Sequence, residues 1–199
     1  MNRKFTGVVL ILAVLLLIPL QGLAAAPMET VEAGVNKVIS KLSEPGFKAQ
    51  AKDVQISQLS ELINTIFDFK ELSMRTLGRE WKKMNAEQQK EFVQLFRELL
   101  QGVYADRLLA YSDQKILFDK ETMLKEGRAE VQSYLQTSDG KKIPLFYRLT
   151  DKSGGWKVYD VIIEGVSMVK NYRTQFREIL AKDSPDKLLE ILREKTGKS

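Results

Sequence analysis

The chain has 199 residues, of which 44% are hydrophobic and 29% are charged, and its formal charge is +5. This length and composition are typical of one globular domain with room for a targeting segment. The sequence contains no cysteine and no histidine. Disulfides, thiol nucleophiles, serine–histidine triads and metal sites built from Cys or His are therefore excluded. Any catalysis would have to use Asp, Glu, Lys, Tyr, Ser or Thr.

The N-terminus has the three parts of a secretory signal peptide. Arg3 and Lys4 precede an apolar run over residues 8–20, and small residues follow at 22 and 24–26. The run is shorter than the roughly 20 residues that a membrane-spanning helix needs. We therefore predict a signal peptide that is cleaved near the alanines at its end. The alternative is an uncleaved membrane anchor.

Cleavage changes what the mature chain is expected to bind. The signal peptide is predicted at 1–25 and the mature protein, a single domain, at 26–199. Residues 1–26 contain two basic residues and no acid, so their removal lowers the formal charge from +5 to +3. A nearly balanced chain gives little support for nucleic-acid binding. Export across the inner membrane predicts a periplasmic location if the source is a Gram-negative bacterium.

The first half of the mature chain has apolar residues at helical spacing. Gly78 is placed to end a short helix, and Asn85 with Gln88 forms a capping box ahead of a long one. Helices are predicted over 28–42, over 56–66, over a short segment that ends near 77, and over about 86–111.

The second half begins with alternating segments that predict strands. The segment 156–163 is apolar on both faces, so we expect it to be covered on both sides. Strands are predicted over 114–118, 128–137, 142–149 and 156–163, followed by a helix that ends near 180 and a last helix that begins at Pro185. This order predicts an α+β fold in which helices pack on an antiparallel sheet of about four strands.

The residues alone give weak signals for catalysis or for charged partners. Asp160 and Glu164 flank the end of an apolar strand and are candidates for an acid/base pair. No partner base or oxyanion motif accompanies them, which favours a hydrogen-bonded Asp160 and a solvated Glu164. The basic doublets at 82–83 and 141–142 favour a solvated surface over contact with an anionic partner.

Several segments and their spacing carry a resemblance to a known family. The segments are FDF at 67–69, IPLFYRL at 143–149, WKVYDVIIEGVS at 156–167 and YRTQF at 172–176, with Trp81, Gln88, Phe92 and Phe96 between them. Together they resemble the MlaC-like family, also called the toluene-tolerance auxiliary proteins. The resemblance covers about residues 29–193.

This resemblance implies a fold and a role. The implied fold is a curved sheet with helices on its concave side, similar to nuclear-transport-factor-2-like domains, that encloses an apolar cavity. The implied role is a periplasmic phospholipid carrier that maintains outer-membrane lipid asymmetry. The implied partners are a phospholipid ligand, the MCE-domain subunit of an inner-membrane ABC transporter and an outer-membrane lipoprotein complex. It implies no cofactor, no metal and no nucleic acid.

Strand alternation and the helical stripe supply candidates for the wall of the implied cavity. The alternative for each residue is plain core. The candidates are Val131, Leu135, Ile143, Leu145, Tyr147, Val166, Val169 and Phe176. Arg148 and Arg173 are candidates for pairing with a lipid phosphate, and the alternative for both is a surface carboxylate partner.

Two other functions stay open beside the lipid carrier, which we expect not to be an enzyme. One is an envelope enzyme on the same fold that uses Asp160 and a tyrosine in the cavity. Loss of turnover in Asp160→Asn would favour this alternative. The other is a non-catalytic adaptor with a solid core, which a filled interior without a co-purifying ligand would favour.

Overall fold

The structure is a computed structural model that describes residues 25–112, 114–152 and 154–198. The predicted signal peptide at 1–25 therefore lies outside the described residues, except for Ala25. Within the described ranges, no helix is long and apolar enough to cross a membrane.

The described residues form six α-helices, two short 3-10 helices and five strands, and they confirm the predicted order of helices, strands and helices. The helices are α1 (Pro27–Leu42), α2 (Lys52–Ile66), α3 (Phe69–Leu77), α4 (Ala86–Leu109), α5 (Met168–Leu180) and α6 (Pro185–Thr196), with 3-10 turns at Phe47–Ala49 and Glu80–Lys83. The strands are β1 (Lys115–Lys125), β2 (Arg128–Gln136), β3 (Lys142–Thr150), β4 (Lys157–Ile163) and β5 (Val166–Ser167).

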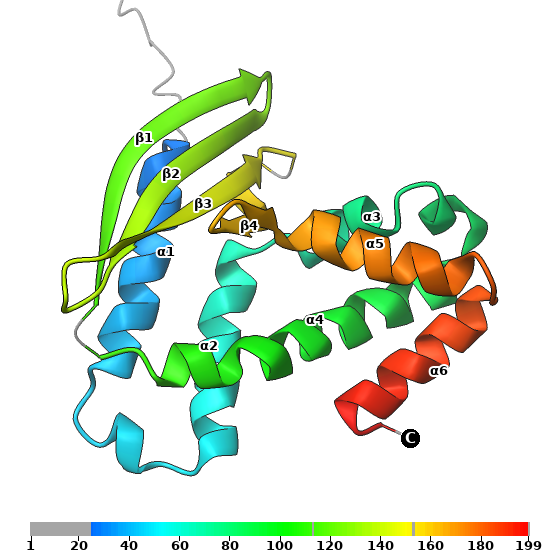
Figure 1. Ribbon diagram of the computed structural model, residues 1–199, viewed down its shortest axis with the longest axis horizontal. Helices are drawn as coiled ribbons and strands as arrows, with labels where there is room; N and C mark the ends of the chain where they lie inside the picture. The colour runs from blue at the N-terminus through cyan, green and yellow to red at the C-terminus, as the bar shows by residue number, and fades with distance from the viewer. Residues whose placement is uncertain (1–24, 113, 153, 199) are drawn as a thin grey trace, which may run out of the picture.

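The strands form one antiparallel sheet in the order β1-β2-β3-β4-β5, so each strand pairs with its neighbours in sequence. Figure 1 shows the sheet curving around α1, which packs against β1 and β2. The central five residues of β4 are buried, as its apolar residues on both faces predict. The predicted α+β fold with helices on a curved antiparallel sheet is confirmed.

The sheet differs from the prediction at two places. β1 continues to Lys125 rather than ending at 118, because its pairing with β2 passes through register shifts at Phe118/Lys120 and Met123/Lys125. Such shifts interrupt the alternation of side chains from which a strand is predicted. The sheet also gains β5, a two-residue strand that pairs with the end of β4 just before α5.

Local capping accounts for the helix ends. The side chain of Asn85 accepts a hydrogen bond from the Gln88 amide at 2.9 Å, and the Gln88 side chain accepts one from the Asn85 amide at 3.0 Å. This confirms the predicted capping box. Gly78 ends α3 with a φ of 59°, which favours glycine. Ser184 caps α6, with Pro185 at its first position.

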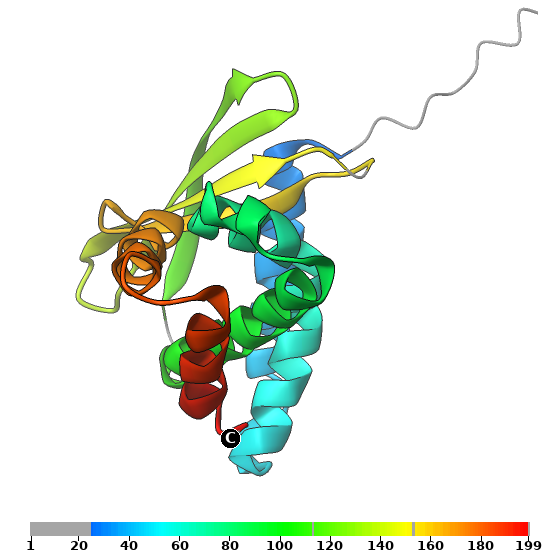
Figure 2. The same ribbon diagram turned by 90° about the vertical axis from the view of Figure 1, so that its right-hand side faces the viewer.

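The apolar interior has two regions, which we call the filled half and the hollow half. In the filled half, α3, α4, α5 and α6 surround a cluster of aromatic rings, and Figure 2 shows α6 lying against α4. The Phe96 ring centroid lies 5.0 Å from that of Tyr172 and 5.2 Å from that of Phe176, both edge to face. The hollow half lies between the sheet and α1, α2 and the second half of α4.

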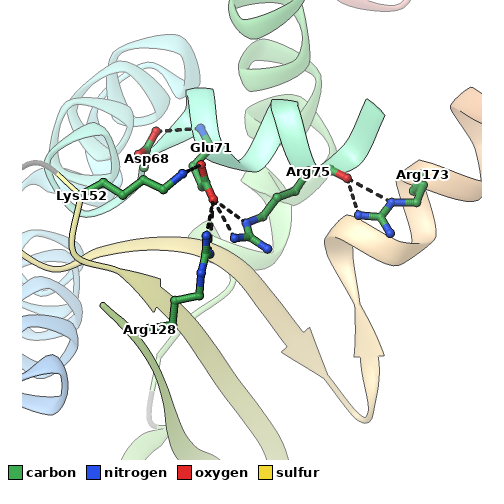
Figure 3. Close-up of polar contacts among 6 residues, drawn as sticks. All are labelled: Asp68, Glu71, Arg75, Arg128, Lys152 and Arg173. Atoms are coloured by element: carbon green, nitrogen blue, oxygen red, sulfur yellow. Dashed lines mark hydrogen bonds and ion pairs between the residues drawn. The ribbon is translucent and has the colours of Figure 1, made fainter. Parts of the chain in front are cut away.

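A buried carboxylate ties α3 to the sheet (Figure 3). Glu71 is 3% exposed and accepts hydrogen bonds from Arg75 and Lys152 at 2.7 Å and from Arg128 at 3.3 Å. Arg128 begins β2, and Lys152 follows β3, so one side chain joins three segments. Asp68 caps the same helix by accepting a hydrogen bond from the Glu71 amide at 2.8 Å. Together these contacts fix the start of α3, where it borders the candidate site.

Candidate functional site

The hollow half contains a cavity of about 690 Å³. This volume is within the range of about 300–1,000 Å³ that small-molecule sites span. The cavity wall is mostly aliphatic and aromatic. It is drawn from α1, α2, α4 and the first four strands, together with Phe67 from the link between α2 and α3 and Phe69 from the start of α3.

Four strands present apolar side chains to the cavity, because their register places residues that point to the same face of the sheet beside one another. Leu135 pairs with Ile116 on one side and with Ile143 on the other. Leu145 pairs with Ile163, and all five of these side chains line the cavity. Period-2 alternation keeps them on one face of the sheet. The lining therefore runs across the sheet near the turn that joins β2 to β3.

The opposite wall comes from α1 and α2, which approach each other closely. A Cβ atom at Gly34 would lie 2.7 Å from two side-chain atoms of Ile66, so a larger residue at this crossing would require the Ile66 side chain to move. The apolar stripe of α1 faces the cavity with Val31, Val35, Val38, Ile39 and Leu42. The sequence shows this stripe plainly, but it does not say whether the stripe faces packed core or open space.

Among the described residues that line the cavity, only two are charged, and both are exposed. Arg107 stands near the end of α4, with its guanidinium 5.7 Å from the centre of the Tyr104 ring. Glu164 lies in the two-residue turn between β4 and β5, with a φ of 50° that is unusual for a residue with a side chain. Exposed charges on an apolar wall mark where the cavity meets solvent. Sequence reasoning missed Arg107 in this role.

The structure places four of the predicted wall residues on the cavity. Leu135, Ile143, Leu145 and Tyr147 all line it. Burial raises the pKa of the Tyr147 hydroxyl above its ordinary value of 10.0, so this side chain is neutral at physiological pH. A neutral, buried phenol fits a wall better than it fits a general base. Contact of these residues with lipid stays a prediction.

The other four predicted wall residues lie elsewhere, which corrects their assignment. Val131 is fully buried where α1 packs on the sheet, whereas the cavity lies at the end of β2 that contains Leu135. Val169 and Phe176 face the filled half. Val166 is 61% exposed on β5. Among the described residues none of the four lines the cavity, because periodicity gives the apolar face but not what lies opposite it.

The two arginines proposed for a headgroup phosphate are also placed away from the cavity wall. The Nε of Arg148 donates to Glu130 at 3.0 Å. The guanidinium of Arg173 donates to the backbone carbonyl of Arg75, with its Nε at 3.0 Å (Figure 3). Both side chains have partners within the protein, so neither is positioned to hold a headgroup at this cavity.

The candidate acid/base pair is separated by the fold. Asp160 is 2% exposed and accepts hydrogen bonds from the Ser167 hydroxyl at 2.7 Å and the Val169 amide at 3.0 Å. It thus caps α5 and does not line the cavity. Glu164 is exposed, as the solvated alternative predicts. Within the described ranges, no group of three acidic side chains is placed to hold a metal ion.

Comparison with known proteins identifies relatives over most of the chain. The family described as MlaC protein matches residues 32–194. A curated relative from Haemophilus influenzae, the intermembrane phospholipid transport system binding protein MlaC, is 34% identical over 58% of this chain and 56% of its own length. Toluene tolerance protein ttg2D from Pseudomonas putida is 30% identical over 53% of this chain and 49% of its own length. The chain therefore spans about half the length of these curated relatives.

A solved structure shares the fold. The phospholipid-binding protein from Ralstonia solanacearum, in complex with a phospholipid, aligns with a TM-score of 0.80 and 26% sequence identity. The alignment covers 87% of this chain and 98% of the other. The relatives from Haemophilus influenzae and Ralstonia solanacearum are named as phospholipid transport or phospholipid-binding proteins and not as enzymes.

Proposed function

The chain belongs to the MlaC family, and from this membership and its cavity we propose that the mature protein is a periplasmic phospholipid carrier. It holds acyl chains in the hollow half and shuttles lipid between an outer-membrane lipoprotein complex and the MCE-domain subunit of an inner-membrane ABC transporter. This transport maintains the lipid asymmetry of the outer membrane. The cavity of about 690 Å³, in a fold that matches a phospholipid-bound relative, carries the proposal.

The apolar wall supports a shuttle on energetic grounds. Each CH₂ group that leaves water gains roughly 0.8 kcal/mol, so acyl chains cannot cross an aqueous gap uncovered. A membrane shields acyl chains from water as the cavity does, so the free energy of transfer between the two is close to zero. Direction then comes from partners that bind the loaded and empty forms with different affinity.

The charged rim suggests where the headgroup lies. We place the lipid phosphate beside Arg107 and a positively charged headgroup amine beside Glu164, because both line the cavity and reach solvent. Arg148 and Arg173 are not part of this proposal, since both already have partners. The strand residues Leu135, Ile143, Leu145 and Tyr147 are proposed to contact the acyl chains.

The location follows from the N-terminal sequence. We propose that residues 1–25 direct export and are removed, and that residues 26–199 work in the periplasm as one domain. N-terminal sequencing of the exported protein tests this step. A mature protein that begins near Ala26 supports it, and a retained N-terminus in the membrane fraction contradicts it.

The first test is mass spectrometry of organic extracts from protein purified without detergent. Wild-type protein is expected to yield phospholipid in a fixed ratio to chain. Ile143→Trp fills the cavity from a wall position outside the packed clusters, so we expect a severalfold loss of recovered lipid. Val166→Trp adds the same side chain at an exposed site and is expected to retain it.

Two outcomes would contradict the carrier proposal. Folded wild-type protein that contains no lipid and takes none up from phospholipid vesicles would favour an adaptor. Equal lipid recovery from Ile143→Trp and Val166→Trp, with both variants folded by circular dichroism, would place the lipid outside this cavity.

A further inference from the structure

A second hollow lies on the other side of the segment that links α2 to α3. This surface pocket has a volume of about 460 Å³. It is lined by Asn64, Phe67, Asp68, Phe69, Lys70, Arg97 and Lys157. Phe67 and Phe69 also line the cavity of the hollow half, so their rings, stacked with centroids 5.5 Å apart, form a wall between the two spaces.

The lining of this pocket is strongly cationic. Lys70 comes from α3, Arg97 from α4 and Lys157 from β4, so three separate elements each bring one positive charge. Asp68 is the one acid in the lining, and its side chain accepts a hydrogen bond from the Glu71 amide at 2.8 Å. The lining therefore has an excess of two positive charges, which attracts an anion.

The hydrogen bonds of Arg97 are incomplete among the described residues. Its Nε is buried and has no hydrogen-bond partner among the described residues. A buried donor without an acceptor is costly, and native structures supply one from protein, water or a bound ligand. Lys157 differs, because its Nζ already donates to the Thr65 carbonyl. The guanidinium of Arg97 thus has no partner among the described residues, and its terminal nitrogens are the atoms that an anion in the pocket would contact. A guanidinium is the group best suited to bind phosphate.

The backbone at the start of α3 also favours binding of an anion. α3 begins at Phe69, and Asp68, Phe69 and Lys70 all line the pocket. The first amides of a helix have no partners within it, and the helix dipole places partial positive charge at this end. A helix start beside three cationic side chains is an arrangement that favours a phosphate oxygen.

We propose that this pocket binds a phosphate-type oxyanion through the guanidinium of Arg97, with Lys70 and Lys157 neutralising its charge. The oxyanion is either free inorganic phosphate or the phosphate of a lipid headgroup, since both present the same group. A lipid phosphate bound here would replace the contact proposed beside Arg107. The site differs from the Arg107 rim of the cavity, from which Phe67 and Phe69 separate it. Binding of free phosphate does not depend on the proposed lipid transport, so the two proposals fail independently.

The test is a titration of the purified protein with sodium phosphate at constant ionic strength, with sodium chloride as the control. The readout is the NMR signal of the Arg97 Nε–Hε group together with backbone amide signals near residue 70. We expect a saturable shift with phosphate and none with chloride. Arg97→Gln is expected to weaken the affinity by about tenfold, as the loss of one charge-assisted hydrogen bond predicts.

Two further variants keep the result interpretable. Lys70→Gln removes a charge at an exposed lining position, so it tests the pocket even if Arg97→Gln does not fold. Lys90→Gln removes the same charge from an exposed site on α4 outside the pocket. We expect weaker phosphate binding in Lys70→Gln and unchanged binding in Lys90→Gln.

A second readout separates the two sources of phosphate. If free phosphate has no effect but the ³¹P signal of co-purified phospholipid shifts in Lys70→Gln or Arg97→Gln, the ligand is a lipid headgroup. If a saturable free-phosphate response is lost in these variants, the ligand is a free anion. If neither signal differs between wild type and the two lining variants, the proposal is overturned.

Discussion

The filled half and the hollow half are both built from apolar residues, but one is a packed core and the other encloses a cavity. In the filled half, the ring centroids of Phe92, Phe96 and Phe176 lie within 5.5 Å of one another. In the hollow half, aliphatic side chains face one another across about 690 Å³. The single helix α4 serves both, with Phe96 in the filled half and Leu108 on the cavity wall.

This difference teaches that an apolar stripe specifies burial but not packing. Whether a stripe meets core or cavity depends on the size and distance of the side chains opposite it. Large rings from α5 reach α4 and close the space there. In the hollow half, α1 and α2 pack closely against each other at Gly34, and the space between these helices and the sheet stays open.

The largest expected effect is on stability and separates the two halves directly. Phe96→Ala removes a ring that contacts three others, so we expect the free energy of unfolding to fall by about 3–5 kcal/mol. Ile143→Ala on the cavity wall is expected to cost about 1 kcal/mol, because less packing is lost there. Urea unfolding measures both, and equal losses would mean that the wall is packed like the core.

A smaller loss is expected from Asp160→Asn, which tests whether the hollow half is an active site. The substitution removes one of two acceptors at the start of α5, so we expect a loss of about 1–3 kcal/mol in unfolding free energy. Lipid recovered per folded chain should not change, since Asp160 does not line the cavity. A loss of lipid at full folding would revive a direct role for this carboxylate.

The smallest expected effect is a change in alkaline stability. Burial raises the pKa of Tyr147 above 10.0, so above that pH the unfolded chain releases a proton that the folded protein keeps. This contribution to stability is complete below about pH 10 and is lost as the pH rises further. Chemical unfolding between pH 9 and 11 should therefore show a steeper decline for wild type than for Tyr147→Phe. Parallel declines would contradict the buried wall position of the hydroxyl.

Much of the fold follows from local signals in the sequence. The capping box at Asn85, the stop at Gly78 and the alternation over 128–137 act within a few residues, and the structure confirms each. The full length of β1 does not follow, because pairing with β2 and two register shifts determine it. These are contacts between segments, which local periodicity does not contain.

The candidate site follows only in part. Ile143 and Leu145 line the cavity, since alternation fixes which face of β3 they share. Val169 and Phe176 lie on the apolar stripe of α5, which is an equally clear pattern, yet they pack in the filled half. Whether an apolar residue lines the cavity or the packed core depends on which helix its face meets. Arg107 is charged, so an apolar pattern could not have identified it.

The edge strand β1 bears on whether copies of the chain associate through their sheets. Its one strand neighbour among the described residues is β2, so its outer backbone groups are available to another chain. An uninterrupted edge of this length would be a template for aggregation. The two register shifts divide it into shorter segments, and Lys115, Lys120 and Lys125 add charge along it. The irregularities that hid the second half of β1 from prediction thus discourage edge-to-edge association between copies of the chain.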